Sequence, residues 1–274
     1  MTSGISAPSS DPAAEEPLWH RVGGPTRPAE TAHGPGRPPV LLLHGFGSTA
    51  DLNWGLTGWL RALHGGGLRT IAPDLPGHGR SPRPRSPERY TPGRLVEDVL
   101  RLLDALAEPR VDVLGYSMGA RLAWELAAGH PDRVRRAVLG GFGPAALPGR
   151  NPATGGAGDG PFDAVFRAAA ALPVNDPDVL AACVRGQTAH PFTADPLPAG
   201  VPVLFAFGEH DDLAAGAETL AARLPAARVV RIPERDHRTA VSAAGFKSAA
   251  LEFLSARSLA TGRDRAGATG AADA

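Results

Sequence analysis

The stretch VDVLGYSMGARLAWELA, from Val111 to Ala127, decides the fold of this 274-residue chain. It opens with the β-branched and apolar residues of a buried strand and closes with apolar residues at helical spacing. The five residues GYSMG at 115–119 therefore join a strand to a helix. A Gly-x-Ser-x-Gly turn in that setting is a nucleophile elbow, which predicts Ser117 as a nucleophile rather than a structural turn serine.

The glycines of this turn fit the same interpretation. The residues two before and two after the serine, Gly115 and Gly119, stand where the turn brings the strand and the helix together. A side chain at either place would collide with the neighbouring strand or helix. We therefore expect both positions to require glycine.

Strands and helices alternate on both sides of the elbow. Continuous apolar runs predict strands covered on both faces, and runs with helical periodicity predict helices between them. This alternation means right-handed crossovers and an α/β fold with a mostly parallel sheet covered by helices on both faces. The predicted strands are Leu18–Val22 (a short edge strand), Val40–Leu43, Leu68–Ala72, Val111–Gly115, Val134–Leu139, Val201–Phe207 and Arg228–Ile232, and the helices are Leu52–Leu63, Leu95–Leu106, Ala120 to about Gly129, Leu213–Leu224 and about Thr239 to Leu254.

The alternation breaks between residues 142 and 199. No strand is indicated there, whereas Pro161–Leu172 and Asp178–Arg185 each place apolar residues on one helical face. We interpret the segment as a small helical lid, because it enters at the carboxyl ends of the strands beside the elbow. An ordinary helical excursion that packs on the sheet is the alternative. A glycine-rich patch at Thr154–Gly160 is expected to form a mobile entry edge.

The remaining residues are assigned by the same criteria. Residues 17–141 and 200–256 are predicted to form one α/β core around the lid. The segments 1–16 and 257–274 lack apolar periodicity and are expected to be disordered tails.

Composition limits the classes of partner. Lys plus Arg equals Asp plus Glu, 28 each, so no net field favours nucleic acid or an anionic membrane. The single cysteine, Cys183, lies among apolar residues and is expected to be a buried hydrophobe rather than part of a disulfide or metal site. No signal sequence or membrane span is apparent. We therefore expect a cytoplasmic enzyme with a small-molecule substrate, and make no prediction of oligomeric state.

Ser117 needs two partners, because a serine hydroxyl is a poor nucleophile at neutral pH. A histidine must take its proton and a carboxylate must orient that histidine. His237 is the one histidine that follows both the elbow and a strand-terminal acid without adjoining that acid. Asp211 and Asp212 compete as the acid, and the second is also a candidate helix N-cap. Asp236 is interpreted as a loop carboxylate.

A tetrahedral intermediate also needs two backbone N–H donors aimed at its oxyanion. Met118 follows the nucleophile at the amino end of a helix, where the macrodipole favours negative charge. Phe46 lies in the loop after the strand Val40–Leu43. These two residues are the predicted oxyanion hole.

Five motifs together resemble the α/β-hydrolase fold superfamily in order and spacing, over about Val40 to Leu254. The resemblance implies a serine hydrolase with a helical lid after the sixth strand, and it favours Asp211 as the acid. Epoxide hydrolases and haloalkane dehalogenases of this superfamily carry an aspartate nucleophile, whereas Ser117 stands here. The motifs are HGFG at 44–47, DLPGHGRS at 74–81, GYSMG at 115–119, GEHD at 208–211 and DH at 236–237.

The elbow is also similar to that of the menaquinone-pathway synthase that eliminates pyruvate. In that enzyme an arginine four residues after the serine binds substrate carboxylate, and Arg121 matches the position. Many simple hydrolases share this elbow, and the lid has few basic residues for a multiply charged acid. A structural Arg121 paired with a neighbouring carboxylate is the favoured alternative to a substrate-binding role.

We therefore expect an ester or lactone hydrolase that acts through an acyl-enzyme and requires no metal or organic cofactor. The apolar lid faces, with Phe162 and Phe166 among them, predict a medium-sized and largely apolar substrate group bound between lid and elbow. The structural alternative is that these faces pack only on each other and on the sheet. Rival functions are a carbon–carbon bond hydrolase or pyruvate-eliminating lyase, and a ligand-binding protein with slow turnover.

Overall fold

The computed structural model describes residues 16–25, 37–144 and 161–256. Nearly all of the expected tails, and the whole of the glycine-rich patch at Thr154–Gly160, lie outside these residues. In the described part of the chain, no helix is long and apolar enough to cross a membrane.

Seven strands form one sheet in the order β1-β3-β2-β4-β5-β6-β7. Only β1 runs antiparallel, against β3 at the edge, and every other pair in the sheet is parallel. This confirms the predicted, mostly parallel α/β sheet. The strands are β1 (His20–Gly23), β2 (Val40–Leu43), β3 (Thr70–Pro73), β4 (Val111–Tyr116), β5 (Val134–Gly140), β6 (Val203–His210) and β7 (Ala227–Asp236).

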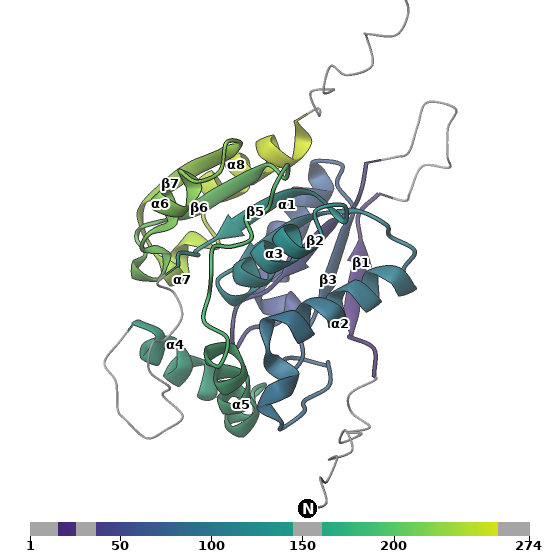
Figure 1. Cartoon of the computed structure of the whole chain (residues 1–274), viewed down its shortest axis with the longest axis vertical. Coiled ribbons are helices and arrows are strands. Elements are labelled where there is room, and N and C mark those ends of the chain that lie inside the picture. The colour runs from purple at the N-terminus through teal and green to yellow at the C-terminus, as the bar shows by residue number, and fades with distance from the viewer. Residues whose placement is uncertain (1–15, 26–36, 145–160, 257–274) are drawn as a thin grey trace, which may run out of the picture.

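Helices cover both faces of this sheet (Figure 1). Residues of α2, α3 and α6 belong to one hydrophobic core, and residues of α1 and α8 belong to the other. Neighbouring residues of one strand serve opposite cores: Leu41 faces the first and Leu42 the second. The central strands are therefore apolar without alternation. The helices are α1 (Trp59–Gly65), α2 (Pro92–Ala105), α3 (Met118–Gly129), α4 (Pro161–Ala170), α5 (Pro177–Thr188), α6 (Ala217–Ala221), α7 (His237–Ala240) and α8 (Ala244–Ser255), with a π-helical turn at Asp51–Gly55 and 3-10 turns at Pro87–Tyr90 and Asp212–Ala214.

Three helices expected as continuous are interrupted. Gly58 and Gly216, with φ of +80° and +82°, separate α1 and α6 from the short turns that precede them. The left-handed conformation ends a helix, but the apolar spacing continues across the break, so periodicity alone does not reveal it. A third break separates α7 from α8, and it makes His237 the first residue of a short helix rather than a loop residue.

The insertion at 142–199 contributes α4 and α5, which lie together at one end of the sheet (Figure 1). Within the described residues five strands precede it, so the expected sixth is not found among them. The two helices are buried differently. Val179 and Cys183 of α5 belong to the core that α2, α3 and α6 share, which we call the main core, and they are 1% and 0% exposed. Phe162 and Phe166 of α4 are instead half-buried.

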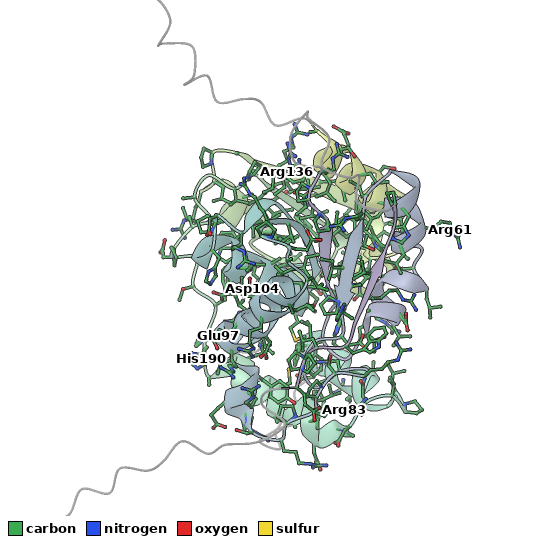
Figure 2. The ribbon with its side chains drawn as sticks, turned by 90° about the vertical axis from the view of Figure 1, so that its right-hand side faces the viewer. Arg61, Arg83, Glu97, Asp104, Arg136 and His190 are labelled. Atoms are coloured by element: carbon green, nitrogen blue, oxygen red, sulfur yellow. The ribbon has the colours of Figure 1, made fainter. Side chains whose placement is uncertain are left out.

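The single cysteine and the charged side chains occupy opposite environments. Cys183 is fully buried with its Sγ 4.0 Å from Met118 Sδ, and burial raises the pKa of its thiol to about 12. It is therefore the buried hydrophobe that the sequence predicted. Charged side chains such as Arg61 and Glu97 are exposed on the outside of the molecule (Figure 2).

The elbow glycines are enclosed by backbone. A Cβ at Gly115 would lie 2.1 Å from the carbonyl oxygen of Gly119 in α3, and a Cβ at Gly119 would lie 2.0 Å from that of Leu43 in β2. Contacts this short are not possible, so either substitution requires the backbone to move. The expectation that both positions require glycine is confirmed.

Gly119→Ala should destabilise the protein by about 3 kcal/mol, because α3 would have to move away from the sheet. The matched control is Gly129→Ala at the other end of α3, where an added Cβ meets nothing within 4 Å. That substitution should be neutral or stabilise by up to about 1 kcal/mol, since alanine favours the helix. Urea unfolding followed by circular dichroism measures both, and equal stability of the two variants would contradict the prediction.

Candidate active site

Ser117 has the backbone of a forced turn, with φ +55° and ψ −116°. This conformation costs a non-glycine residue about 1–3 kcal/mol, and it persists only where the surroundings enforce it. Its N–H donates to the carbonyl oxygen of Gly140 on β5 at 2.8 Å, and α3 begins with the next residue. The turn therefore holds the hydroxyl at the carboxyl end of the central strands.

Three side chains from separate parts of the chain meet at this turn. Ser117 Oγ lies 3.0 Å from His237 Nε2, and His237 Nδ1 lies 2.9 and 3.1 Å from the two carboxylate oxygens of Asp211. A carboxylate only accepts, so Nδ1 carries a proton and Nε2 is free to accept from the serine hydroxyl. The carboxylate is fully enclosed, while 15% of the histidine side chain is exposed.

Asp211 has a second bond that fixes its carboxylate. Its Oδ1 accepts from the N–H of Leu213 at 3.1 Å, which makes Asp211 the N-cap of the 3-10 turn at Asp212–Ala214. The prediction that Asp212 is the cap is therefore wrong, because the turn begins one residue earlier than expected. Asp236 accepts from the N–H groups of the next turn and caps α7, which fixes the backbone at His237.

Tyr116 belongs to the site, although the sequence did not predict it there. Its hydroxyl donates to the backbone carbonyl of His237 at 2.6 Å, and the two rings lie 5.4 Å apart. The pair is separated by 121 residues. No local pattern signals such a contact, because the variable position of the elbow accepts many residue types.

The loop after β2 holds one peptide group in a fixed orientation. The carbonyl of Gly45 accepts from His44 Nδ1 at 2.9 Å and from the N–H of Ser48 at 3.2 Å. That carbonyl and the N–H of Phe46 belong to the same peptide group, so the bonds to the carbonyl also fix the direction of the N–H. Within the described residues, neither the N–H of Phe46 nor that of Met118, the first residue of α3, donates a hydrogen bond to the protein.

Two buried histidines lock this loop to the loop after β3. His44 Nε2 accepts from the N–H of Leu75 at 2.9 Å. His78 donates from Nδ1 to the carbonyl of Pro76 at 2.9 Å and accepts at Nε2 from the N–H of Gly47 at 3.0 Å. Each ring has one acceptor and one donor as partners, so each must be neutral. Burial accordingly lowers the pKa of His44 to about 4 and that of His78 to about 3.

The two α4 phenylalanines contact Phe46. The ring of Phe46 lies 5.4 Å from that of Phe162 and 6.0 Å from that of Phe166, between centroids. The insertion thus packs its aromatic face directly on the residue that carries one candidate oxyanion donor.

Arg121 is engaged by the protein itself. It is 2% exposed, and its guanidinium donates to the carbonyls of Gln187 and His190 and pairs with Glu125 at 3.4 Å. Burial lowers the pKa of Arg121. These contacts agree with the favoured structural alternative, in which Arg121 pairs with a neighbouring carboxylate, and they argue against the substrate-binding role also considered for it. Arg121 joins α3 to the carboxyl end of α5.

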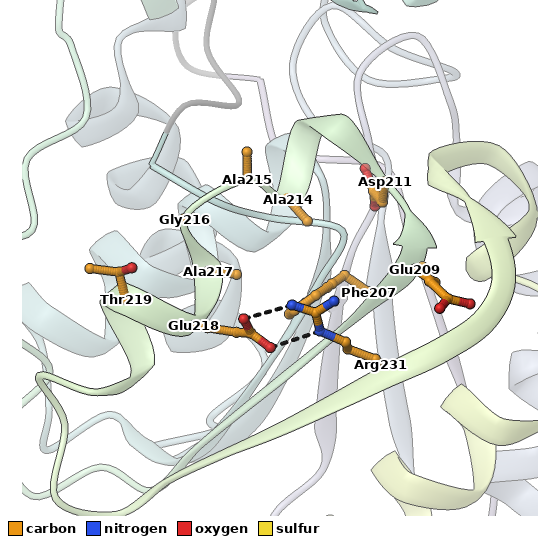
Figure 3. Close-up of a pocket in the computed structure, with 11 residues that line it drawn as sticks. Phe207, Glu209, Asp211, Ala214, Ala215, Gly216, Ala217, Glu218, Thr219 and Arg231 are labelled. Carbon is orange, nitrogen blue, oxygen red and sulfur yellow. Dashed lines mark hydrogen bonds and ion pairs between the residues drawn. The ribbon is translucent and has the colours of Figure 1, made fainter.

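A polar pocket of about 230 Å³ lies behind the acid, between β6, β7 and α6 (Figure 3). Its wall includes Asp211 and the exposed ion pair of Glu218 with Arg231. Ser117 and His237 do not line it, so it does not offer a bound group to the nucleophile. Within the described residues, no group of three or more His, Cys, Asp or Glu side chains could hold a metal ion.

The known proteins that resemble this chain have the α/β-hydrolase fold that its own structure shows. A family model described as the alpha/beta hydrolase fold matches residues 38–151. Over 101 residues the chain is 41% identical to Epoxide hydrolase 2 of Siraitia grosvenorii, covering 37% of this chain and 31% of that protein. Over 103 residues it is 42% identical to 2-hydroxymuconate semialdehyde hydrolase of Pseudomonas putida, covering 38% and 36%. The matched part spans about a third of the length of these curated relatives.

Solved structures match over more of the chain. The enol-lactonase of Burkholderia xenovorans LB400 aligns with a TM-score of 0.69 at 26% sequence identity. The alignment covers 87% of this chain and 96% of that protein.

The neutral histidines predict how stability depends on pH. Their pKa values are lower in the folded protein than the ordinary 6.5, so the unfolded chain binds more protons between about pH 6.5 and pH 4. The free energy of unfolding should therefore decrease as the pH is lowered through this window, by up to about 1.4 kcal/mol per pH unit for each histidine. His78→Asn should be less stable at pH 7 but should lose less between pH 7 and pH 5.

Asn53→Ala is the control for this measurement. Asn53 Oδ1 accepts from the N–H of Gly45 at 3.0 Å, so the variant loses a bond to the same loop without losing a titrating group. It should be destabilised at pH 7 and keep the wild-type pH slope in urea titrations. A wild-type slope in His78→Asn would show that His78 is not the titrating group.

Proposed function

Because this chain belongs to the α/β-hydrolase fold superfamily, we propose that it is a serine hydrolase that cleaves a carboxylic ester or lactone through an acyl-enzyme. The hydrogen-bonded relay of Ser117, His237 and Asp211 at the elbow carries the proposal. This is the arrangement that converts a serine hydroxyl into a nucleophile.

The reaction follows from the donors and acceptors of the relay. Ser117 Oγ attacks the carbonyl carbon as His237 Nε2 takes its proton, and Asp211 stabilises the imidazolium that forms. The N–H groups of Phe46 and Met118 hold the oxyanion, with the amino end of α3 behind the second. The imidazolium then returns the proton to the leaving alkoxide. Water, deprotonated by the same histidine, hydrolyses the acyl-enzyme and restores the serine.

Chemistry argues against epoxide opening by the same residues. An epoxide attacked by Ser117 would leave an ether on the enzyme, which water does not hydrolyse under these conditions, whereas a carbonyl substrate leaves an ester. The identity to the Siraitia protein covers 37% of this chain, and it supports the fold rather than that substrate.

A carbon–carbon bond hydrolase is the second candidate, favoured by the identity to the Pseudomonas putida hydrolase. The same relay would serve it, and turnover of dicarbonyl acids with esters left nearly untouched would identify it. A pyruvate-eliminating lyase is less supported, because the guanidinium of Arg121 already has protein partners. A ligand-binding protein of this fold would bind its ligand tightly and would turn over both esters and dicarbonyl acids very slowly.

The substrate group is proposed to be medium-sized and largely apolar. The support is the cluster of Phe46, Phe162 and Phe166, whose half-buried rings meet at the oxyanion loop. Apolar surface at this position is favourable only when it is covered by the protein or by a bound group.

Ser117→Ala should lower kcat for a short-chain nitrophenyl ester by at least about a thousandfold, because the nucleophile is removed. Ser242→Ala, an exposed serine between α7 and α8, is the control and should keep wild-type turnover. A fluorophosphonate label should attach to the control and not to Ser117→Ala. Substantial activity in the folded Ser117→Ala variant would refute the assignment.

Phe166→Ala should change kcat/KM selectively for longer acyl chains, because it removes part of the proposed pocket wall. Phe192→Ala is the control. That half-buried ring packs on Trp124 and Phe142, at 5.6 and 5.1 Å between centroids, and it has no ring contact with Phe46. The control should lower stability without changing chain-length preference. A series of nitrophenyl esters measures both, and an equal loss along the series in Phe166→Ala would mean that α4 does not contact the substrate.

A further inference from the structure

Asn175, in the turn between α4 and α5, joins the insertion to the loop after β2. Its Nδ2 donates to the carbonyl of Gly47 at 2.8 Å and to that of Ala169, near the end of α4, at 2.9 Å. Both partners are carbonyl oxygens, so the amide nitrogen must face them and the orientation of the side chain is unambiguous. Asn175 is 8% exposed, which shields these bonds from water.

Helix α4 rests directly on the residue that Asn175 binds. A Cβ at Gly47 would lie 2.2 Å from Cβ of Ala169, and Gly47 has φ of +67°. Glycine is therefore required there by space and by conformation. It is also the most flexible residue type, so its position depends on what binds its peptide groups.

Those peptide groups are held from two directions. The N–H of Gly47 donates to His78, and its carbonyl accepts from Asn175. Phe46 lies immediately before this residue, and the preceding carbonyl, that of Gly45, is held by His44 and Ser48. Of these contacts, only the one from Asn175 comes from outside the sheet and its loops.

The side-chain amide of Asn175 adds little to the free energy of unfolding, although it is buried and hydrogen-bonded. Asn175 Oδ1 is buried without a hydrogen-bond partner among the described residues. An unsatisfied buried carbonyl is destabilising, which offsets much of what the two Nδ2 bonds contribute. An apolar side chain of similar size would avoid that cost but could not hold the Gly47 carbonyl.

We infer that Asn175 is a positioning residue of the active site, which acts through Gly47 to hold the N–H of Phe46 toward the oxyanion. This inference rests on the proposed function. It makes the α4–α5 turn part of the catalytic geometry, although Asn175 itself contacts no reacting atom.

Asn175→Ala should lower kcat for a nitrophenyl ester by about 10- to 100-fold, because a displaced donor loses part of its transition-state stabilisation. KM should change less than about threefold, since the oxyanion forms only after binding. Asn175→Leu removes the donor and leaves the Gly47 carbonyl unpaired but fills the space, so it should show the same fall in kcat with a smaller loss of stability than Asn175→Ala.

Gln187→Ala is the matched control. Gln187 lies in α5, is 4% exposed, donates from Nε2 to the carbonyl of Tyr90 at 2.7 Å and leaves its Oε1 without a partner among the described residues. The variant thus removes the same kind of buried amide from the same insertion, but away from Gly47. It should lose stability comparably to Asn175→Ala, with kcat within about threefold of wild type.

The activity of the wild-type protein distinguishes failure of the proposed function from failure of the inference alone. If it turns over no ester, lactone or dicarbonyl acid and takes no fluorophosphonate label, the proposed function fails and the inference falls with it. If it is active and the Asn175 variants keep the kcat of Gln187→Ala, the inference alone is overturned. A loss of kcat that simply follows loss of stability across the three variants overturns it as well.

Discussion

The close approach of α3 to the central strands is the constraint on which the site depends. Backbone lies about 2 Å from where Cβ atoms would stand at Gly115 and Gly119, and the turn between them forces Ser117 to a positive φ. The same approach places the end of β2 beside the nucleophile: a Cβ on Gly45 would lie 3.5 Å from Cβ of Ser117. One packing contact therefore strains the serine and brings the candidate oxyanion loop next to it.

Three histidines of this region, His44, His78 and His237, carry their proton on Nδ1 and differ in the group that accepts it. In His44 and His78 the Nδ1–H donates to a backbone carbonyl, which cannot compensate a full charge, and burial keeps both rings neutral. In His237 the Nδ1–H donates to the carboxylate of Asp211, which stabilises an imidazolium. The first two suit a permanent lock between loops, and the third suits proton transfer.

Local pattern was enough for the parts of the molecule that depend on local sequence. The strands and the glycines of the elbow were predicted because buried parallel strands are apolar throughout and a tight turn excludes Cβ atoms. The interrupted helices were missed because Gly58 and Gly216 break the backbone without breaking the apolar spacing. The contact of Tyr116 with His237 could not be predicted for another reason. It joins two residues far apart in sequence through one hydrogen bond, and such a contact produces no periodic pattern in the sequence.

The two helices of the insertion are held in different ways. The carboxyl end of α5 is tied to α3 by Arg121, its apolar face is in the main core, and Gln187 binds the carbonyl of Tyr90. Helix α4 instead meets the core through the half-buried rings around Phe46 and through the two bonds of Asn175. Moving α5 would expose core surface, whereas the rings that α4 packs on Phe46 are only half-buried in the present position. These contacts of α4 are made with the candidate oxyanion loop, whereas those of α5 are made with the core.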